Sequence, residues 1–487
     1  LLQKKEGVCV NIAIPQPLKL LGRAFSERGV SLYAVGGLVR NTLLGLPLSD
    51  WDTASAAPPE RAAAIGRELG LKADVRDAAF GTVRLSGVLG GERFLTECTT
   101  FRREVYAQGG SHRPTGVVFS QDIAADAFRR DFTVNALYAH TQTGEVIDPT
   151  GGQKDLKKRL IRATTPDPNV ILQDDGLRVL RLARFACELG FEVEKKTLAA
   201  ARAHAHGLWD IPGERRAAEL VKLLLSDARY GAPQPGGASA PARGILLLHS
   251  LGALGAVLPS LLPCCNVQQD PKYHRYDVFH HSVCAMAFAP PALVLRLAAL
   301  LHDVGKPLSL SARGDMHEHP ALGAEAAGAD LAALRLPKAL AERVCALIEG
   351  HMYDLRGDAK EKTLRRRFAQ LGPEFVRQLA EVRRADFRGS AGRYGRVASA
   401  ERWLYLLGRM EGEGAPFSPN ELAVTGRDLM ALGFSGPAVG EVKHWLWLHA
   451  AAFPKENTPA RLLRLAEGYK KGAQKAAARE AEENNEF

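Results

Sequence analysis

The chain has 487 residues, which is too long for one ordinary domain and predicts three or four. Hydrophobic residues make up 46% of the composition and charged residues 24%, which is typical of a globular protein and argues against a disordered chain. The formal net charge of +10 indicates an anionic partner, with nucleic acid ahead of a membrane surface.

Seven cysteines are scattered along the chain without a C-x-x-C pair, which argues against a disulfide framework or a zinc knuckle and fits a reducing cytoplasm. The start, "LLQKKEGVCVNIAIPQ", lacks Met and shows no signal peptide. The most apolar run, "PALVLRLAALLHDVG", carries charged residues and is too short to span a bilayer, so we expect a buried helix and no membrane partner. Nothing in the pattern indicates an oligomeric state.

Two kinds of periodicity divide the chain. Residues 1–150 mix short β-type runs, such as "SLYAVGG" and "GTVRLSGVL", with helical segments, which predicts an α/β domain. Beyond it helical periodicity dominates and predicts an all-α remainder. The segment "RYGAPQPGGASAPARG" (229–244) predicts a flexible linker or a surface insertion. The helical pieces are then 151–228, 245–395 and 396–470, and residues 471–487 are expected to be disordered or a solvated helix.

The stretch "YAVGGLVRNTLLG" (33–45) predicts a strand, a glycine turn at Gly36 and Gly37, and a helix. Such a turn presents backbone N–H groups and the positive end of a helix, where a polyphosphate can approach closely. Arg40, one turn into the helix, can add a bidentate phosphate contact. For an isolated pair of glycines, a plain tight turn is the commoner explanation.

Asp50 and Asp52 follow this helix and flank Trp51. Alternate residues of a strand point the same way, so the two carboxylates repel each other unless a cation lies between them. Mg²⁺ prefers one or two carboxylates together with substrate phosphates. Two such ions could activate an attacking hydroxyl and stabilise a leaving pyrophosphate. Glu97, in "FLTECTT", is the candidate for a third carboxylate, and an ordinary exposed strand residue is the alternative.

Three ordered motifs carry a resemblance to a known family: "GGLVRNTLLG....DWD", "RRDFTVNAL" (129–137) and "DDGLRVLRLARFACELGF" (174–191). Together they resemble the tRNA nucleotidyltransferases, the CCA-adding enzymes shared by bacteria and eukaryotes, with the bacterial poly(A) polymerases as close relatives. The resemblance runs from about residue 31 to 225 and, more loosely, to about 470. This sequence departs from the family at Asn41 and Asp174, where Asp and Glu are usual.

The resemblance implies a polymerase-beta-like nucleotidyltransferase head with a mixed sheet at 1–150, then an all-α neck, body and tail. It implies that Asp50 and Asp52 hold Mg²⁺, and that the nucleotide is contacted by Arg130 and its ribose by Asp131 and Asn135. Without the family, "RRDFTVNA" would equally be a helix cap. The resemblance also extends phosphate or base contacts to Arg181 and Arg184.

Asp175 and Arg178 are three residues apart on an expected helix and would share a face. Cytosine and adenine each present an amino donor beside a ring-nitrogen acceptor, which a carboxylate and a guanidinium complement. Such a pair can admit C and A and reject G and U, and the family resemblance assigns it this role. The alternative is an i,i+3 salt bridge on a solvated helix.

A second set of polar residues lies in "HRYDVFHHSV", "LAALLHDVGKP", "HEHPALGAE", "HMYD" and "RRADF". Burying His302 and Asp303 at the end of an apolar helix is costly unless a metal satisfies them. The order resembles the ligands of an HD phosphohydrolase domain: His281, His302, Asp303 and Asp386, with His319 and His351 for a second ion. Imidazole with carboxylate suits Mn, Fe, Ni or Co. A helical body with packed histidines is the alternative.

The expected function is template-independent addition of C, C and A to tRNA 3′ ends from CTP and ATP, with tRNA and these nucleotides as partners. Lys443, His444 and Trp447 of the tail are expected to supply charge and stacking for RNA. Two alternatives stay open. One is a poly(A) polymerase or an enzyme that adds only CC or only A, and the other is an HD phosphohydrolase acting on RNA ends.

Overall fold

The computed structural model describes residues 10–48, 51–106, 114–237, 239–391 and 395–483. Its chain forms two compact units. The first unit comprises Leu1–Leu262 with Ala329–Pro337, and the second comprises Pro263–Gly328 with Lys338–Phe487. A mixed sheet in the first unit, followed by helices, confirms the expected fold class.

A seven-stranded sheet with the order β3-β4-β5-β2-β1-β8-β9 forms the base of the first unit. β2 and β5 pair in parallel, whereas the other neighbouring strands pair antiparallel. The strands are β1 (Leu32–Val35), β2 (Asp52–Ser55), β3 (Lys72–Asp77), β4 (Thr82–Leu89), β5 (Glu92–Thr100), β8 (Tyr138–His140) and β9 (Val146–Ile147).

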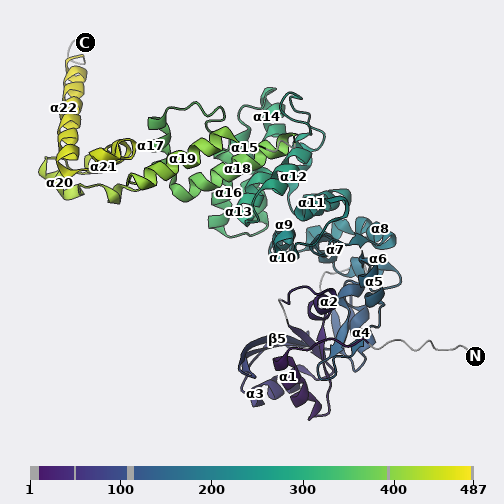
Figure 1. Ribbon diagram of the computed structural model, residues 1–487. Helices are drawn as coiled ribbons and strands as arrows, with labels where there is room; N and C mark the ends of the chain where they lie inside the picture. The colour runs from purple at the N-terminus through teal and green to yellow at the C-terminus, as the bar shows by residue number, and fades with distance from the viewer. Residues whose placement is uncertain (1–9, 49–50, 107–113, 238, 392–394, 484–487) are drawn as a thin grey trace, which may run out of the picture. The chain divides into compact units, whose positions relative to one another are not determined.

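Each face of this sheet is buried by different helices. α1 (Gln16–Ser26) and α3 (Pro59–Glu68) contact each other and cover one face, against the alternating buried residues of β4 and β5 (Figure 1). On the other face, Val35, Ala54 and Tyr138 form a buried cluster with residues of α4 (Ile123–Phe128) and its surroundings. Because strand side chains alternate, one short strand such as β2 contributes to both cores.

Helices follow the sheet in the first unit. α2 (Gly37–Leu44) follows β1 directly. The motif "RRDFTVNA", which could also have begun a regular helix, contains the short 3₁₀ helix η1 (Thr133–Asn135). Two small sheets pair β6 (Arg102–Val105) with β7 (Gly116–Phe119) and β10 (Leu160–Ile161) with β11 (Glu192–Val193). The remaining helices are α5 (Gly152–Lys158), α6 (Pro168–Asp174), α7 (Leu177–Leu189), α8 (Lys195–Ala203), α9 (Gly213–Leu224), α10 (Ser226–Tyr230) and α11 (Ala240–Ser250).

The segment 229–244 is not a linker between compact units. Gln234 donates a hydrogen bond to the carbonyl of Cys187 at 2.7 Å, and Arg243 donates to the carbonyls of Ala186 and Phe191 at 2.9 and 2.8 Å. These bonds hold the segment on the end of α7, and the division between units comes later, at Leu262. The Pro- and Gly-rich composition reflects tight turns on a packed surface.

In the second unit, every element of regular structure among the described residues is a helix. α12 packs extensively on α18 and also on α13, and α17 on α21. Its helices are α12 (Val278–Phe288), α13 (Leu293–Leu301), α14 (Lys306–Arg313), α15 (His319–Ala333, which ends in the first unit), α16 (Lys338–Gly350), α17 (Glu361–Leu371), α18 (Pro373–Ala391), α19 (Ala398–Gly412), α20 (Gly426–Ala431), α21 (Pro437–Ala452) and α22 (Pro459–Glu483). Among the described residues, no helix combines the length and apolarity needed to cross a membrane.

Gly389 of α18 lies in close contact with the backbone of α12. A Cβ built on Gly389 would lie 2.6 Å from the backbone nitrogen of Ala285, so the helices would have to separate. We expect Gly389→Ala to destabilise the protein by about 1–3 kcal/mol, the usual cost of overpacking. Gly408, inside α19, is the matched control, because a Cβ added there would meet no atom within 4 Å. Gly408→Ala should be neutral or stabilising by up to about 1 kcal/mol, since Ala favours helix.

Denaturant unfolding of both variants, followed by circular dichroism, checks this prediction. An unchanged midpoint for Gly389→Ala would show that the two helices can separate without cost.

Candidate functional site

A cavity of about 720 Å³ in the first unit brings together the predicted nucleotide-binding residues. Ten cationic and five acidic side chains line it, which favours an anionic ligand. Among its lining residues are Gly36, Gly37, Arg40, Asp52, Arg130, Asp131, Asn135, Asp175, Arg178, Arg181 and Arg184. These positions are spread over almost 150 residues of sequence, and the fold brings the residues of all three motifs into one cavity.

Gly36 makes the turn between β1 and α2. Its φ of +61° lies in the left-handed region, where glycine carries no steric cost. A Cβ at this position would stand 3.4 Å from the carbonyl oxygen of Asn135. That distance is an ordinary contact, so the positive φ is the reason for glycine here, and the start of α2 faces the cavity at Gly37.

Arg40 is buried, and each of its three guanidinium nitrogens donates one hydrogen bond. It donates to the side-chain oxygen of Asn41 through Nε (3.0 Å) and Nη2 (2.9 Å), and to that of Asn135 through Nη1. Burial lowers the pKa of Arg40. The Asn41 amide donates in turn to the carbonyl of Pro47 and the hydroxyl of Tyr230. An aspartate at position 41 could not make these two donations, so the departure from the family changes how α2 is attached to α10.

Asp52 and Glu97 are register partners on the parallel strands β2 and β5. Both side chains are exposed and belong to the same face of the sheet, and Asp52 also lines the cavity. Two adjacent oxygen ligands beside a cationic cavity fit a hard divalent cation such as Mg²⁺. Asp50, the other predicted ligand, lies outside the described residues.

Arg130 is held by a buried network. Its guanidinium donates to Asp126 at 2.9 Å and to the hydroxyl of Tyr138 at 2.9 Å, and that hydroxyl donates to Asp126 at 2.6 Å. Arg129 pairs with the same carboxylate at 2.7 Å. Burial alone would raise the pKa of Asp126, but the attraction of Arg130 and Arg129 lowers it to about 2. Asp126 was missed in the sequence, where it reads as an ordinary helix residue.

Asp131 and Arg181 hold each other across the cavity wall. Arg181 donates to Asp131 from Nε at 2.7 Å and lies 2.6 Å from it at Nη2, and Asn135 donates to the other oxygen at 3.2 Å. Burial would raise the pKa of Asp131, and the charge of Arg181 lowers it instead. Asp131 therefore stays ionised and keeps both neighbours oriented.

The helix that was expected to carry both Asp175 and Arg178 begins after Asp175. α7 starts at Leu177, and Asp175 is extended, with φ −143° and ψ 106°. One Asp175 oxygen accepts from the backbone N–H of Leu177 at 3.1 Å, which is a helix cap. The prediction that the two residues share a helix face is therefore wrong, because the acidic residue is used to begin the helix.

Other partners hold the side chains of Asp175 and Arg178. Arg215 of α9 donates to Asp175 at 3.0 Å. Arg178 donates to the carbonyls of Ile171 at 2.6 Å and Arg129 at 2.9 Å. The two side chains nevertheless line the same cavity, as base recognition requires.

Arg184 is buried between two carboxylates. It donates to Glu219 of α9 at 2.5 Å and to Glu188 of α7 at 2.8 Å, and its guanidinium lies 3.9 Å from the ring centre of Phe185. Glu219 and Arg215 were missed in the sequence. Their i,i+4 spacing in "GERRAAEL" was the available signal, and it reads equally as a surface ion pair.

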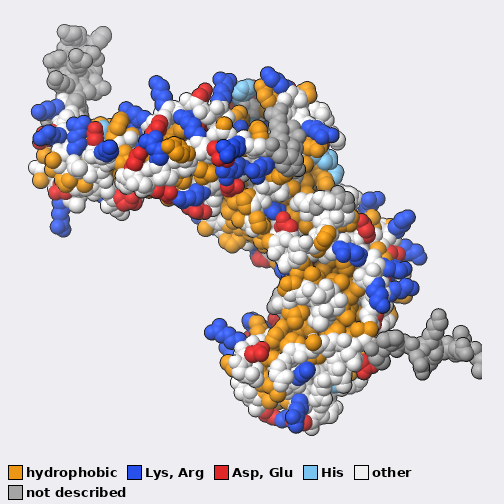
Figure 2. All heavy atoms as spheres, viewed as in Figure 1, with side chains coloured by type: hydrophobic (Ala, Val, Ile, Leu, Met, Phe, Trp, Pro, Cys, Tyr) orange, Lys and Arg blue, Asp and Glu red, His pale blue; other side chains and the backbone are white. Residues whose placement is uncertain are grey.

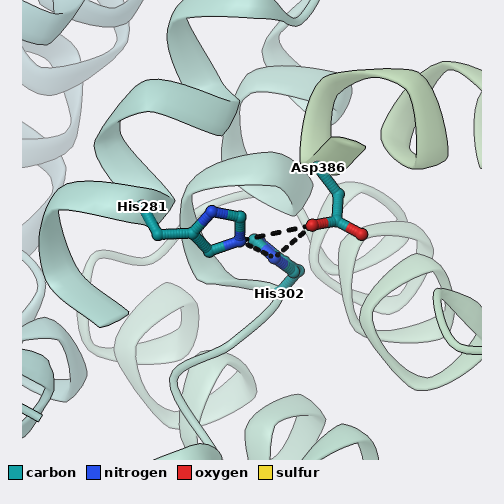
Figure 3. A group of neighbouring side chains, drawn as sticks. All are labelled: His281, His302 and Asp386. Carbon is teal, nitrogen blue, oxygen red and sulfur yellow. Dashed lines mark hydrogen bonds and ion pairs between the residues drawn. The ribbon is translucent and has the colours of Figure 1, made fainter. Parts of the chain in front are cut away.

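The predicted HD ligands converge in the second unit. His281 of α12, His302 at the end of α13 and Asp386 of α18 form one group whose side chains point toward each other (Figure 3). His281 Nε2 lies 3.1 Å from His302 Nε2 and 3.3 Å from the Asp386 carboxylate. Asp303, His319 and His351 form a second group.

Asp303 connects the two groups. One of its oxygens lies 3.4 Å from His281 and 3.2 Å from His302, and the other lies 3.3 Å from His319 and 3.7 Å from His351. Its side chain is 2% exposed. A carboxylate in this position can bridge two cations, one in each group.

The histidine tautomers support metal binding. His302, His319 and His351 place Nδ1 at 2.8, 2.5 and 2.6 Å from backbone carbonyls, which assigns the proton to Nδ1 of each neutral ring. The Nε2 lone pairs of His319 and His351 then face each other at 3.2 Å. Facing lone pairs repel unless a cation lies between them, and such carbonyl bonds are typical behind metal-bound histidines.

Two surfaces offer contacts for a polyanion. Exposed lysines of α5 and α8 gather on the first unit, where Figure 2 shows blue side chains over these helices: Lys154, Lys157, Lys158, Lys195 and Lys196.

In α21, Trp447 is 7% exposed and donates to the carbonyl of Pro416, so the expectation that it stacks on RNA is wrong. The exposed indole of this helix is Trp445, at 37%.

A sheet with two neighbouring carboxylates beside an arginine-rich cavity defines a nucleotidyltransferase head. Family models agree: residues 32–162 match the poly A polymerase head domain, 190–231 match the probable RNA- and SrmB-binding site of polymerase A, and 278–384 match the HD domain. The chain belongs to the tRNA nucleotidyltransferase and poly(A) polymerase family.

Three relatives cover most of the chain. The A-adding tRNA nucleotidyltransferase of Deinococcus radiodurans is 34% identical over 87% of this chain and 92% of its own. The CC-adding tRNA nucleotidyltransferase of Thermus thermophilus is 32% identical, covering 84% and 87%, and the multifunctional CCA protein of Xanthomonas campestris is 31% identical, covering 85% and 96%.

The solved structures agree with the fold. The CCA-adding enzyme of Bacillus stearothermophilus in complex with CTP matches with a TM-score of 0.69 and 25% identity over 95% of this chain and 98% of that chain. The CCA-adding enzyme of Thermotoga maritima complexed with tRNA, at 20% identity and a TM-score of 0.54, shows the same fold.

Replacement of Asp126 tests the buried network. Asp126→Asn leaves Arg129 and Arg130 without their shared counter-charge and should cost about 3 kcal/mol of unfolding free energy at pH 7. Because the folded-state pKa of Asp126 is depressed from 3.8 to about 2, its contribution is complete above pH 3.8 and is lost as pH falls toward 2. The gap between parent and variant should therefore narrow over that range in denaturant titrations. A constant gap would contradict the assignment.

Proposed function

We propose that this protein adds C, C and A to the 3′ end of tRNA, using CTP and ATP and releasing pyrophosphate. The observation that carries the proposal is the cavity of about 720 Å³, which holds Asp52 and all ten of the predicted nucleotide-binding residues. The exposed lysines of α5 and α8 would contact tRNA phosphates, and such contacts weaken steeply with salt. Transfer RNA processing of this kind fits the cytoplasm expected from the cysteines.

In the proposed reaction the terminal 3′-hydroxyl of tRNA attacks the α-phosphate of the nucleotide in line. Asp50, Asp52 and Glu97 would hold Mg²⁺, which when bound lowers the pKa of the hydroxyl and neutralises charge on the phosphates. Gly36 and Gly37 allow the triphosphate close to the backbone, and Arg40 and Arg130 orient it. Asp131 and Asn135 position the ribose through its hydroxyls.

Asp175 and Arg178 would select the base. A carboxylate oxygen of Asp175 accepts from the amino group of cytosine or adenine, and Arg178 donates to the neighbouring ring nitrogen. Guanine and uracil present a carbonyl where the carboxylate needs a donor. Both side chains line the cavity, and a ribonucleotide base would exchange the carbonyl partners of Arg178 for its own acceptor.

The product length decides between full CCA addition and its alternatives. Transfer RNAs that end before C, after C and after CC are incubated with each nucleotide and Mg²⁺, and the products are sized. We expect CTP to extend the first two and ATP the third, with no further growth. Long A tails would indicate a poly(A) polymerase, and extension of only one class of substrate would indicate a CC- or A-adding enzyme.

Neutralising the sheet carboxylate tests the chemistry itself. Asp52→Asn should slow nucleotide addition by roughly two to three orders of magnitude, the scale of losing one charge-stabilising group. Asp74 lies in β3 and pairs with Arg76, outside the cavity, so Asp74→Asn is the matched control. Single-turnover rates at saturating CTP provide the measurement. Equal rates for parent and Asp52→Asn would refute the metal assignment.

We also propose that the HD cluster binds transition metals (Mn, Fe, Ni or Co) and supports a phosphohydrolase activity on RNA ends. The support is the convergence of four imidazole Nε2 atoms on Asp303 and Asp386. His281, His302 and Asp386 would hold one ion, and His319 and His351 a second, with Asp303 between them. Oxygen and imidazole ligands in this ratio suit these metals better than Mg²⁺ alone.

Metal analysis tests the HD site independently of its activity. We expect about one to two transition-metal ions per parent chain, and the loss of at least one in His302→Ala. His280 neighbours the cluster in sequence, but its side chain is 52% exposed, so His280→Ala is the matched control and should keep the parent's metal. Metal-free parent protein, after growth and purification with added Mn²⁺, would contradict the proposal.

A further inference from the structure

Helix α9 presents a charged stripe to the nucleotide cavity. Arg215, Glu219 and Lys222 are spaced i, i+4 and i+7, which places them on one helix face. Arg215 and Lys222 line the cavity, and Glu219 lies behind it at 5% exposure. None of the three belongs to the motifs through which the family was recognised. α9 also packs closely on α7, which carries the residues proposed to contact the nucleotide.

Each charged partner on α9 holds a side chain of the proposed nucleotide site. Arg215 Nη2 lies 3.0 Å from the Asp175 carboxylate, whose side chain is 16% exposed. Glu219 lies 2.5 Å from Arg184 and 3.7 Å from Arg181, and both the Glu219 and Arg184 side chains are at most 6% exposed. The Glu219–Arg184 pair has little access to solvent and resists reorientation because any other arrangement leaves a charge unpaired, whereas the side chains of Arg215 and Arg181 are 36% and 32% exposed.

We infer that Arg215 and Glu219 are positioning residues of the nucleotide site, with Arg215 determining base selectivity and Glu219 determining nucleotide affinity. The inference rests on the proposed function. Arg215 acts through Asp175, whose carboxylate must face the base's amino group; Glu219 acts through Arg181 and Arg184, which are proposed to contact phosphate or base. Neither α9 residue needs to touch the nucleotide for these roles.

Arg215 has a distinct geometric task because Asp175 is not on a helix. One Asp175 oxygen is fixed by the N–H of Leu177, and Arg215 fixes the other. With both bonds the carboxylate plane is defined, so its remaining lone pairs accept from an amino donor at one place and repel a carbonyl oxygen that occupies the same place. Without Arg215 the carboxylate can rotate about its single remaining bond, so mismatched bases meet a less strictly placed acceptor.

Single-nucleotide addition kinetics with CTP, ATP, UTP and GTP test the inference. Arg215→Ala should lower the ratio of kcat/KM for CTP over UTP by about tenfold, the worth of one well-placed hydrogen bond. Arg215→Lys keeps a cation near Asp175 and should recover part of that ratio. Glu219→Gln should raise KM for CTP and ATP alike, about tenfold, and leave the ratio unchanged.

Two surface variants are the controls. Arg23→Ala removes an exposed arginine from α1, and Glu214→Gln removes an exposed ion pair at the start of α9; both should behave as the parent. Thermal unfolding is measured for each variant, and Arg215→Lys supplies the selectivity comparison where Arg215→Ala does not fold.

Asp175→Ala separates failure of this inference from failure of the proposed function. If Asp175→Ala relaxes selectivity while Arg215→Ala and Arg215→Lys keep the parent's ratio, the role of Arg215 is wrong and the base-selecting role of Asp175 stands. If the parent extends no truncated tRNA, the proposed function itself fails. A selectivity change in Glu219→Gln, with KM unchanged, would overturn the division of roles on α9.

Discussion

Buried guanidinium groups are the constraint on which the first unit depends. Arg40, Arg130, Arg181 and Arg184 all reach the cavity; Arg40 and Arg184 are buried, and the side chains of Arg130 and Arg181 are 18% and 32% exposed. A charge held away from water is tolerated only when it is paired and hydrogen-bonded. Carboxylates pair with three of these arginines, Asp126 with Arg130, Asp131 with Arg181, and Glu188 and Glu219 with Arg184, whereas Arg40 donates to the amide oxygens of Asn41 and Asn135. The arginines are therefore oriented before any phosphate arrives, so binding does not have to order them.

The fold was predictable where a motif coincides with a turn or a strand. Gly36, with its positive φ, marks the end of β1, and Asp52 marks the start of β2 one helix later. The motif therefore indicated that Gly36 and Asp52 lie near each other. The counter-charges were not predictable in the same way. Asp126 pairs with Arg129 and Arg130 three and four residues away, a spacing that solvated surface pairs share, and Glu219 pairs with Arg184 of a different helix, which leaves no periodic signal.

Asp175 shows a second limit of sequence reasoning. Spacing assigned it to the helix of Arg178, but an aspartate just before a helical run also satisfies the free N–H groups at the helix start. Asp175 accepts from the backbone N–H of Leu177 and from Arg215, so it caps the start of α7 and faces α9. The segment 229–244 shows the reverse, because its composition is that of a linker while Arg243 and Gln234 fasten it to α7.

The charges of the HD cluster, which comprises His281, His302, Asp386, Asp303, His319 and His351, are arranged differently from those of the cavity. In the cavity the arginines are paired with carboxylates or bonded to amide and carbonyl oxygens, whereas in the second unit four imidazoles surround two carboxylates, and Nε2 of His319 faces Nε2 of His351. The first arrangement is complete without a ligand and can release one. The second arrangement favours a cation: burial alone would lower the pKa of His302, but Asp303 and Asp386 raise it to about 10, although Lys306 and Arg383 already pair with these carboxylates.

The number of nucleotides added is not encoded in the residues that choose the base. Cytosine and adenine offer the same donor and acceptor to Asp175 and Arg178, so one pair serves both additions. A relative named for A addition is 34% identical to this chain and one named for CC addition is 32% identical. These two values are too similar to favour either product. Neither the chemistry of the base nor the identity to these relatives therefore separates the possible products. Because Arg215 and Glu219 of α9 pair with Asp175 and Arg184, which line the cavity, a small shift of that helix would alter the cavity through the side chains proposed to contact the nucleotide.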